Sequence, residues 1–175
     1  MQSAISTDRG AFFTRRHRHL LIIGRRPPRR AHAPAPQHYL DKTNAVKVPD
    51  KLGATVDELQ EPLAGLSPCA KSSFGCMGDA NIRGRIEDSG RKQVLLCGIE
   101  THVCVWQTAA ALLRDDYSVH LICDATSSRS VFNRDVGFRR MERAGVHMSC
   151  VEMVLFELMV DAAHPKFRDV TRLLK

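Results

Sequence analysis

From about residue 40 onward the chain alternates short apolar runs with stretches of helical periodicity, and this alternation is what most constrains its fold. Three runs of strand length lie at 94–97, 119–123 and 146–151. Helical spacing of apolar residues follows them at 104–114, 130–144 and 152–160, and a last helix is expected to begin at Pro165. Alternating strands and helices predict a parallel sheet with helices on both faces and right-handed crossovers. We therefore expect an α/β fold.

The segment from Val94 to Trp106, which reads VLLCGIETHVCVW, carries the best candidate for chemistry. An apolar strand runs into Gly98, and a helix is expected whose first turn holds Cys104. A thiol placed there meets backbone N–H groups and the positive end of a helix dipole, which favour thiolate and bind an oxyanion. A cysteine between two valines is also a common core residue. The fold favours a nucleophile, because ligand sites gather at the carboxyl ends of parallel strands, where Cys104 and the loop 124–129 both emerge.

Length and cysteine usage narrow the class of protein. A chain of 175 residues suits one domain with a proper core. No run approaches the roughly 18 apolar residues that a membrane span needs, so we expect a soluble protein without a membrane span. The six cysteines include no C-x-x-C pair. That spacing argues against a disulfide framework or structural zinc and favours a reducing compartment such as the cytoplasm.

The net charge of +7 belongs to the first 36 residues, which hold eight arginines against Asp8, while the remainder carries 18 basic and 18 acidic residues. We therefore divide the chain into a basic, disordered or atypical leader at 1–40 and a folded domain at 41–175. Phe12 and Phe13 are the only aromatic residues in the basic part, too few for a specific nucleic-acid module. Three interpretations of the leader stay open: a mitochondrial or other organelle-targeting peptide, a nonspecific polyanion-binding arm, or residues foreign to the domain.

Six motifs in the domain occur in the order of one known family: LGATVDEL at 52–59, KSSF at 71–74, GIETHVCVWQTA at 98–109, DATSSRS at 124–130, EMVLFEL at 152–158 and HPKF at 164–167. Together they resemble the isochorismatase-like cysteine hydrolases, in particular the isochorismatase domain-containing subgroup. The resemblance implies a three-layer α/β/α, Rossmann-like fold with a mainly parallel sheet. It also implies hydrolysis of amides, ureido groups or vinyl ethers of small molecules, and a homo-oligomer.

The same resemblance assigns roles to single residues. Cys104 is expected to be the nucleophile and Lys71 its electrostatic partner. A cis peptide bond is expected between Ile99 and Glu100, and the backbone amides of Glu100 and Cys104 would hold the oxyanion. Without the resemblance, Lys71 reads as a solvated surface lysine.

Further residues are weaker candidates for the substrate pocket. We expect Thr101, His102 and Phe74 to line it, although a polar residue in a tight loop often satisfies backbone groups instead. Serines 127, 128 and 130 are interpreted as helix caps. Nothing in residues 40–70 reproduces the Asp-x-His metal motif of the nicotinamidase branch, so we expect no metal and no cofactor.

One catalytic position departs from the family pattern. The family has an aspartate at the end of its first, central strand, but the comparable run here, residues 19–23, ends in Gly24-Arg25-Arg26. Either this first strand is degenerate or the N-terminal third has been replaced, and the run 20–23 is a candidate to fill its slot. Asp41 and Asp50 are the nearest carboxylates, and no motif selects either. Loss of a general acid–base costs about 10²–10⁴-fold in rate.

Two hypotheses from different classes follow. The first is a hydrolase in which a cysteine nucleophile attacks a small amide-like or vinyl-ether substrate. The alternative is a catalytically impaired or truncated homologue that serves as a scaffold or interaction protein. A binder of nucleic acid or membrane surfaces acting through the arginine-rich segment is a third, marked by a steep salt dependence.

Overall fold

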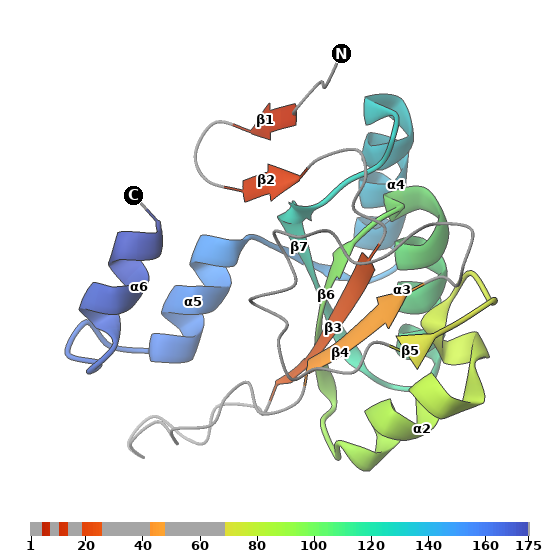
Figure 1. Cartoon of the computed structure of the whole chain (residues 1–175), viewed down its shortest axis with the longest axis horizontal. Coiled ribbons are helices and arrows are strands. Elements are labelled where there is room, and N and C mark those ends of the chain that lie inside the picture. Colours follow the sequence, from red (N-terminus) through yellow and green to blue (C-terminus); the bar gives the residue numbers. More distant parts are fainter. Residues whose placement is uncertain (1–4, 8–10, 14–18, 26–42, 48–68, 175) are drawn as a thin grey trace.

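The computed structural model describes residues 5–7, 11–13, 19–25 and 43–47 as backbone strands and residues 69–174 in full. Figure 1 shows the arrangement of the elements. They are, in chain order, β1 (Ile5–Thr7), β2 (Ala11–Phe13), β3 (His19–Arg25), β4 (Thr43–Lys47), β5 (Cys69–Ala70), the 3-10 helix η1 (Cys76–Gly78), α2 (Ala80–Asp88), β6 (Gln93–Gly98), the π-helical turn η2 (Thr101–Val105), α3 (Trp106–Arg114), β7 (Ser118–Thr126), α4 (Val131–Arg143), β8 (His147–Ser149), α5 (Val151–Met159) and α6 (Phe167–Leu173).

The central sheet has six strands in the order β5-β4-β3-β6-β7-β8. Strands β6, β7 and β8 run parallel to one another, and the helices α3 and α4 connect them. Strands β4 and β5 are also parallel. The parallel half of the sheet with its connecting helices confirms the predicted α/β fold. Strands β1 and β2 form a separate antiparallel pair.

Strand β3 takes the place beside β6 that the run 20–23 was a candidate to fill, but it runs antiparallel to both of its neighbours. Its register pairs Leu20 with Gly98 and Arg25 with Gln93. Antiparallel pairing satisfies the backbone groups along β6, which would otherwise be a sheet edge. The carboxyl end of β3 therefore lies at the opposite end of the sheet from Gly98.

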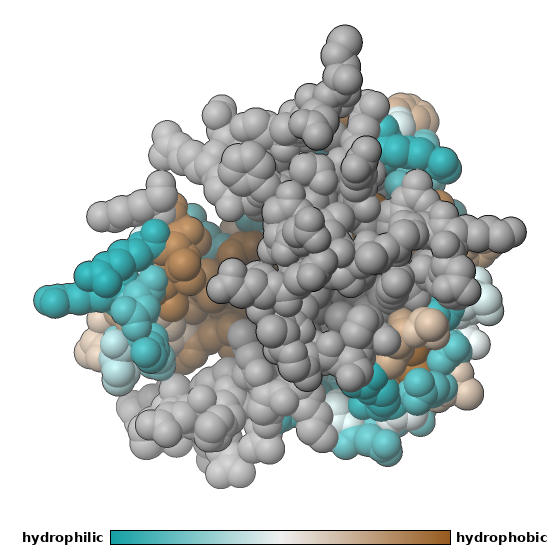
Figure 2. Space-filling model, in the orientation of Figure 1, coloured by the Kyte–Doolittle hydropathy of each residue, from teal (hydrophilic) through white to brown (hydrophobic). Residues whose placement is uncertain are grey.

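Helices α5 and α6 lie together at one side of the molecule (Figure 1). The rings of Phe156 and Phe167 meet edge to face, with centroids 6.2 Å apart. Several large apolar side chains of this pair are exposed, among them Met153 at 50% and Leu173 at 78%. Figure 2 shows hydrophobic surface, in brown, on the side where Figure 1 places these helices.

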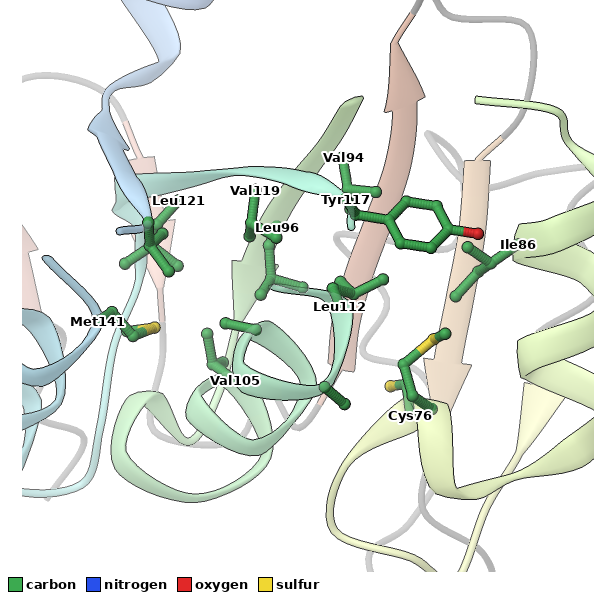
Figure 3. Packing of buried hydrophobic residues seen from close by; sticks show 14 of the residues in the cluster. Cys76, Ile86, Val94, Leu96, Val105, Leu112, Tyr117, Val119, Leu121 and Met141 are labelled. Atoms are coloured by element: carbon green, nitrogen blue, oxygen red, sulfur yellow. The ribbon is translucent and has the colours of Figure 1, made fainter. Parts of the chain in front are cut away.

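The core lies on both faces of β6 and β7, whose residues alternate between the two sides. One face packs Val94, Leu96, Val119 and Leu121 against α2, α3 and α4, as Figure 3 shows for the labelled residues. The other face packs Leu95 and Ile122 against Val154 and Leu158 of α5. Burying each such side chain contributes about 1.5–3 kcal/mol. Helices thus cover both faces, which gives the three layers that the sequence predicts.

Local signals set the helix ends. The Asp79 carboxylate accepts the N–H of Ile82 at the start of α2, and the Ser130 hydroxyl accepts that of Asn133 at the start of α4. Gly145 follows α4 with φ +93°, a conformation that favours glycine, as expected for a helix C-terminus. None of the six cysteines, all of which lie among the described residues, forms a disulfide. Among the residues described, no helix combines the length and apolar character that crossing a membrane requires.

Candidate active site

The candidate nucleophile lies in an irregular turn between β6 and α3. The peptide bond between Ile99 and Glu100 is cis, at the position that the resemblance implies. The Glu100 carbonyl then accepts the N–H groups of both Val103 and Val105 at 3.1 Å, which winds 101–105 into a π-helical turn. The helix expected over 104–114 therefore begins at Trp106 instead, because this wider turn precedes it. Such turns are frequent at functional sites.

Cys104 lies within this turn, two residues before α3, and its side chain is partly exposed. Its neighbour Val105 has no exposed surface and belongs to the core cluster. The turn thus directs the valine into the core and leaves the thiol accessible at the N-terminal end of α3. This geometry favours the nucleophile over the interpretation of Cys104 as a core residue.

The loop that follows β7 holds the π-helical turn in place through hydrogen bonds. The N–H of Thr101 donates to the Ser127 carbonyl at 3.0 Å and to the Ser128 hydroxyl at 3.1 Å. The Thr101 hydroxyl donates to the same Ser127 carbonyl at 2.7 Å, and Nδ1 of His102 lies 3.1 Å from the Ser128 hydroxyl. Thr101 has no exposed surface. We therefore assign Thr101 to holding the turn in place, whereas the partly exposed His102 faces Ser128.

Only one of the three serines in this loop caps a helix. Ser130 caps α4, as expected. Ser128 is buried, and its hydroxyl instead accepts the N–H of Thr101 and lies within hydrogen-bond distance of the His102 ring. Ser127 contributes its backbone: the N–H donates to the Gly98 carbonyl at 3.1 Å. The prediction that Ser127 and Ser128 cap a helix is wrong, because Ser130 takes that position at α4 and the Ser128 hydroxyl accepts the Thr101 N–H instead.

Lys71 is buried, with 3% of its surface exposed, and follows β5 directly. Its ammonium donates to the carbonyls of Ser73 and Phe74, each at 2.8 Å. A lysine carries three such donors, so two are used to hold the charge inside its own loop. This burial excludes the interpretation of Lys71 as a solvated surface residue, since desolvating an ammonium is costly unless it has partners or a function.

Cys76, a second thiol that the sequence did not single out, lies within electrostatic range of both candidate catalytic residues. Burial raises the pKa of Cys76 from 9.0 to about 11, against the opposing effects of a hydrogen bond with Thr108 and of the Lys71 charge, while Cys104 adds to the rise. The loop that follows Lys71 packs on α3, because the Cys76 N–H donates to the hydroxyl of Thr108, one turn after Cys104. A thiol with so high a pKa stays protonated at neutral pH, which argues against Cys76 as a nucleophile.

Phe74, Trp106 and Glu100 differ in their exposure and contacts. Phe74 is 64% exposed, which leaves its ring free for contact with a substrate. Trp106 packs on the core, with the Arg140 guanidinium 4.5 Å from its ring centre. The Glu100 carboxylate accepts the N–H of Arg129 at 3.2 Å and lies 3.9 Å from Nδ1 of His102. It is the carboxylate closest to the turn along the chain, and Nε of Arg129 lies 3.8 Å from it.

The strand-end carboxylate of the family pattern has no counterpart on β3 or β4. On the other side of β6, β7 carries Asp124, whose carboxylate accepts the N–H of Val151 at 3.0 Å. Strand β3 reads HLLIIGR and β4 reads TNAVK, so neither carries an acidic residue. Asp41, Asp50 and the motif at 52–59 lie outside the described residues. Across the part of the chain that is described, no group of three His, Cys, Asp or Glu side chains is placed to hold a metal ion.

Comparison with known proteins identifies the family of this chain. The isochorismatase domain family model matches residues 11–153. Isochorismatase domain-containing protein 2 of Danio rerio is 39% identical over 127 residues, which cover 72% of this chain and 63% of that protein. The secreted isochorismatase effector Isc1 of Phytophthora sojae is 46% identical over 85 residues, covering 49% of this chain and 40% of that protein.

Among solved structures, the MAR1 ribonuclease from Caenorhabditis elegans superposes with a TM-score of 0.64 at 38% identity, covering 71% of this chain and 64% of that one. The chain thus matches between 40% and 64% of the length of these three relatives. The family match, which spans most of the chain, together with the identity to the Danio rerio protein, shows that the chain belongs to the isochorismatase family.

Proposed function

We propose that this chain is a hydrolase in which Cys104 attacks an sp² carbon of a small amide-like or vinyl-ether substrate. One observation carries the proposal: a partly exposed thiol lies in a π-helical turn at the start of α3, and the loop of the buried Lys71 packs on the same helix. A buried cation near a thiol stabilises the thiolate and the negative charge that develops during attack. Family membership supports a hydrolase, and the choice of nucleophile and substrate is our proposal.

For an amide, the chemistry has two stages. The Cys104 sulfur adds to the carbonyl carbon, and the backbone amides of Glu100 and Cys104 stabilise the resulting oxyanion. The oxyanion then collapses, the C–N bond breaks, and the nitrogen leaves with the proton that the Cys104 thiol released, which leaves a thioester on Cys104. Water adds to the thioester and releases the carboxylic acid and the free thiol. The Thr101 N–H is already bonded to Ser127 and Ser128, so it does not take part as an oxyanion donor.

A catalytically impaired scaffold is the alternative, and the lack of an acidic residue on β3 and β4 favours it. One experiment separates the two hypotheses. The purified chain is incubated with a panel of small amides, ureido compounds and vinyl ethers, with Cys104→Ser as the control. Product release together with a covalent adduct on Cys104, both absent from the control, supports the hydrolase. Rapid alkylation of Cys104 without any turnover or adduct supports the scaffold.

An RNA substrate is a second candidate, favoured by the name of the C. elegans protein and by the eight arginines in residues 1–36. The test is cleavage of end-labelled RNA by the full chain. Cleavage that is lost in Cys104→Ser supports a ribonuclease. Cleavage that persists in this variant excludes the proposed site as its source.

We further propose that the chain forms a homo-oligomer. Exposed apolar side chains on α5 and α6, such as Met153 and Leu173, support the proposal because such surface is costly to leave in water. Light scattering coupled to size-exclusion chromatography tests it. A mass of one chain at micromolar concentration would contradict it.

A further inference from the structure

Thr108 connects two segments of the candidate active site that are far apart in the sequence. It lies in α3, one turn after Cys104, and has no exposed surface. Its hydroxyl donates to the Cys104 carbonyl at 2.7 Å and accepts the N–H of Cys76 at 2.9 Å. A donation to the carbonyl four residues earlier is common for helical threonines. The second bond is different, because it joins α3 to a segment 32 residues away.

The segment held by this second bond is the one that carries Lys71. The Lys71 ammonium donates to the Ser73 and Phe74 carbonyls, and the Ser73 hydroxyl donates to the Gly75 carbonyl at 2.9 Å. Hydrogen bonds therefore run from the ammonium to the residue just before Cys76. Lys71 is hydrogen-bonded within its own loop, so the position of this loop determines the position of the ammonium group.

Close packing leaves little room for an alternative attachment. A Cβ added at Gly75 would lie 3.2 Å from the backbone carbon and the Cβ of Gln107, so this loop rests directly on α3. Cys76 itself has no exposed surface, and water has no access to its N–H. A buried N–H without a partner is costly, and Thr108 supplies that partner.

We propose that Thr108 is a positioning residue that sets the placement of the Lys71 loop relative to the turn presenting Cys104. The inference rests on the proposed function, in which Lys71 and Cys104 act as a pair. The Thr108 hydroxyl bonds to both segments: it donates its proton to the Cys104 carbonyl, and its oxygen accepts the Cys76 N–H. Thr108 acts through these two groups and need not touch the substrate.

The expected effect follows from electrostatics. At an effective dielectric constant of about 20, lengthening a charge–charge distance from about 4 to about 6 Å shifts the thiolate equilibrium about tenfold. Replacing Thr108 by valine keeps the shape of the side chain and removes the hydroxyl. We expect alkylation of Cys104 at pH 7 to slow about tenfold in Thr108→Val, and the pH profile of alkylation to move upward by about one unit.

The experiment compares three threonine variants of the full chain. Alkylation of each cysteine is followed by peptide mass spectrometry across pH, and urea unfolding is measured in parallel. Thr108→Ser retains the hydroxyl and should restore most of the Cys104 rate. Thr171→Val is the matched control, because the Thr171 hydroxyl also donates to a carbonyl four residues earlier, that of Phe167, at 2.9 Å. It lies in α6 and should leave the Cys104 profile unchanged.

A milder variant covers the case in which Thr108→Val does not fold. Ser73→Ala breaks the same series of bonds at a partly exposed residue. It should slow Cys104 alkylation by about twofold to threefold, since it removes one hydrogen bond between uncharged groups. The pH profile is the deciding measurement, because a general loss of stability does not move its midpoint.

The outcomes separate this inference from the proposed function. If wild-type Cys104 reacts no faster than the partly exposed Cys97, the proposed function itself fails. If Cys104 reacts rapidly in the wild type and keeps the same pH profile in folded Thr108→Val, or in Ser73→Ala where that variant alone folds, the positioning role is overturned. A shifted profile in Thr108→Val, restored in Thr108→Ser and absent from Thr171→Val, supports it.

Discussion

Gly137 offers the sharpest test of how α4 supports the catalytic turn. It lies within α4, where alanine ordinarily stabilises a helix by about 1 kcal/mol relative to glycine. Here a Cβ would lie 2.9 Å from Cγ2 of Thr101, and 3.1 and 3.2 Å from the backbone N and Cα of His102. Thr101 is buried and its hydroxyl is bonded to Ser127, so its methyl group has nowhere to rotate.

The expected magnitude is a difference of two opposing effects. Overpacking a dense site costs about 1–3 kcal/mol, which cancels or exceeds the gain in helix propensity. Gly84→Ala is the matched control, because Gly84 lies within α2 and a Cβ there meets nothing within 4 Å. We expect Gly84→Ala to stabilise the chain by about 0.5–1 kcal/mol and Gly137→Ala to be about 1–3 kcal/mol less stable than that control.

Urea unfolding of the two variants, analysed at a common slope, gives this difference. The Cys104 alkylation rate is a second measurement, because displacing the π-helical turn changes the environment of the thiol. Equal stabilisation by the two alanines, with Cys104 unaffected, would refute the close approach of α4 to the turn. A loss of stability in Gly84→Ala would show instead that Gly84 does not report the gain in helix propensity alone.

Three further predictions concern single side chains. Because burial raises the pKa of Cys76 from 9.0 to about 11, the folded chain keeps this proton longer than the unfolded chain. The free energy of unfolding should therefore fall by up to about 3 kcal/mol between pH 9 and 11 in urea titrations, and Cys76→Ala should flatten that fall. Asp79→Ala removes the cap of α2 and should cost about 1 kcal/mol by the same assay, whereas an unchanged midpoint would contradict the cap. Ser128→Ala should slow Cys104 alkylation through the freed His102 ring, while Thr101 keeps its bond to Ser127; an unaltered rate would show that Ser128 does not support the turn.

The regular elements could be predicted where one periodicity dominates. The runs at 94–97 and 119–123 alternate between two buried faces, and they lie within β6 and β7. Helix α2 was not predicted, because only Ile82 and Ile86 of its nine residues are buried apolar side chains and charged residues fill most of the rest. The direction of β3 was also beyond prediction. A strand of alternating residues presents the same pattern whether its neighbour is parallel or antiparallel.

Some residues of the candidate site could likewise be predicted from the sequence, and others could not. Cys104 and Lys71 stand in motifs that resemble a known family, so their assignment needed only local sequence. Thr108 and Ser128 act through hydrogen bonds to residues 32 and 27 positions away, and no spacing in the sequence encodes such partners. The π-helical turn was missed because its hydrogen bonds depend on how the chain leaves β6, whereas the apolar spacing of α3 begins only after it.

The alkylation rate of Cys104 at pH 7, measured in the wild type and in Lys71→Met, tests the central claim most directly. Methionine keeps much of the buried stem of Lys71 and removes its charge, and urea unfolding verifies that the variant folds. We predict that Cys104 reacts faster than the partly exposed Cys97 and Cys123, and that the substitution slows it about tenfold. A Cys104 rate that matches those of Cys97 and Cys123, and that does not respond to the loss of the Lys71 charge, would contradict a preorganised cysteine–lysine site.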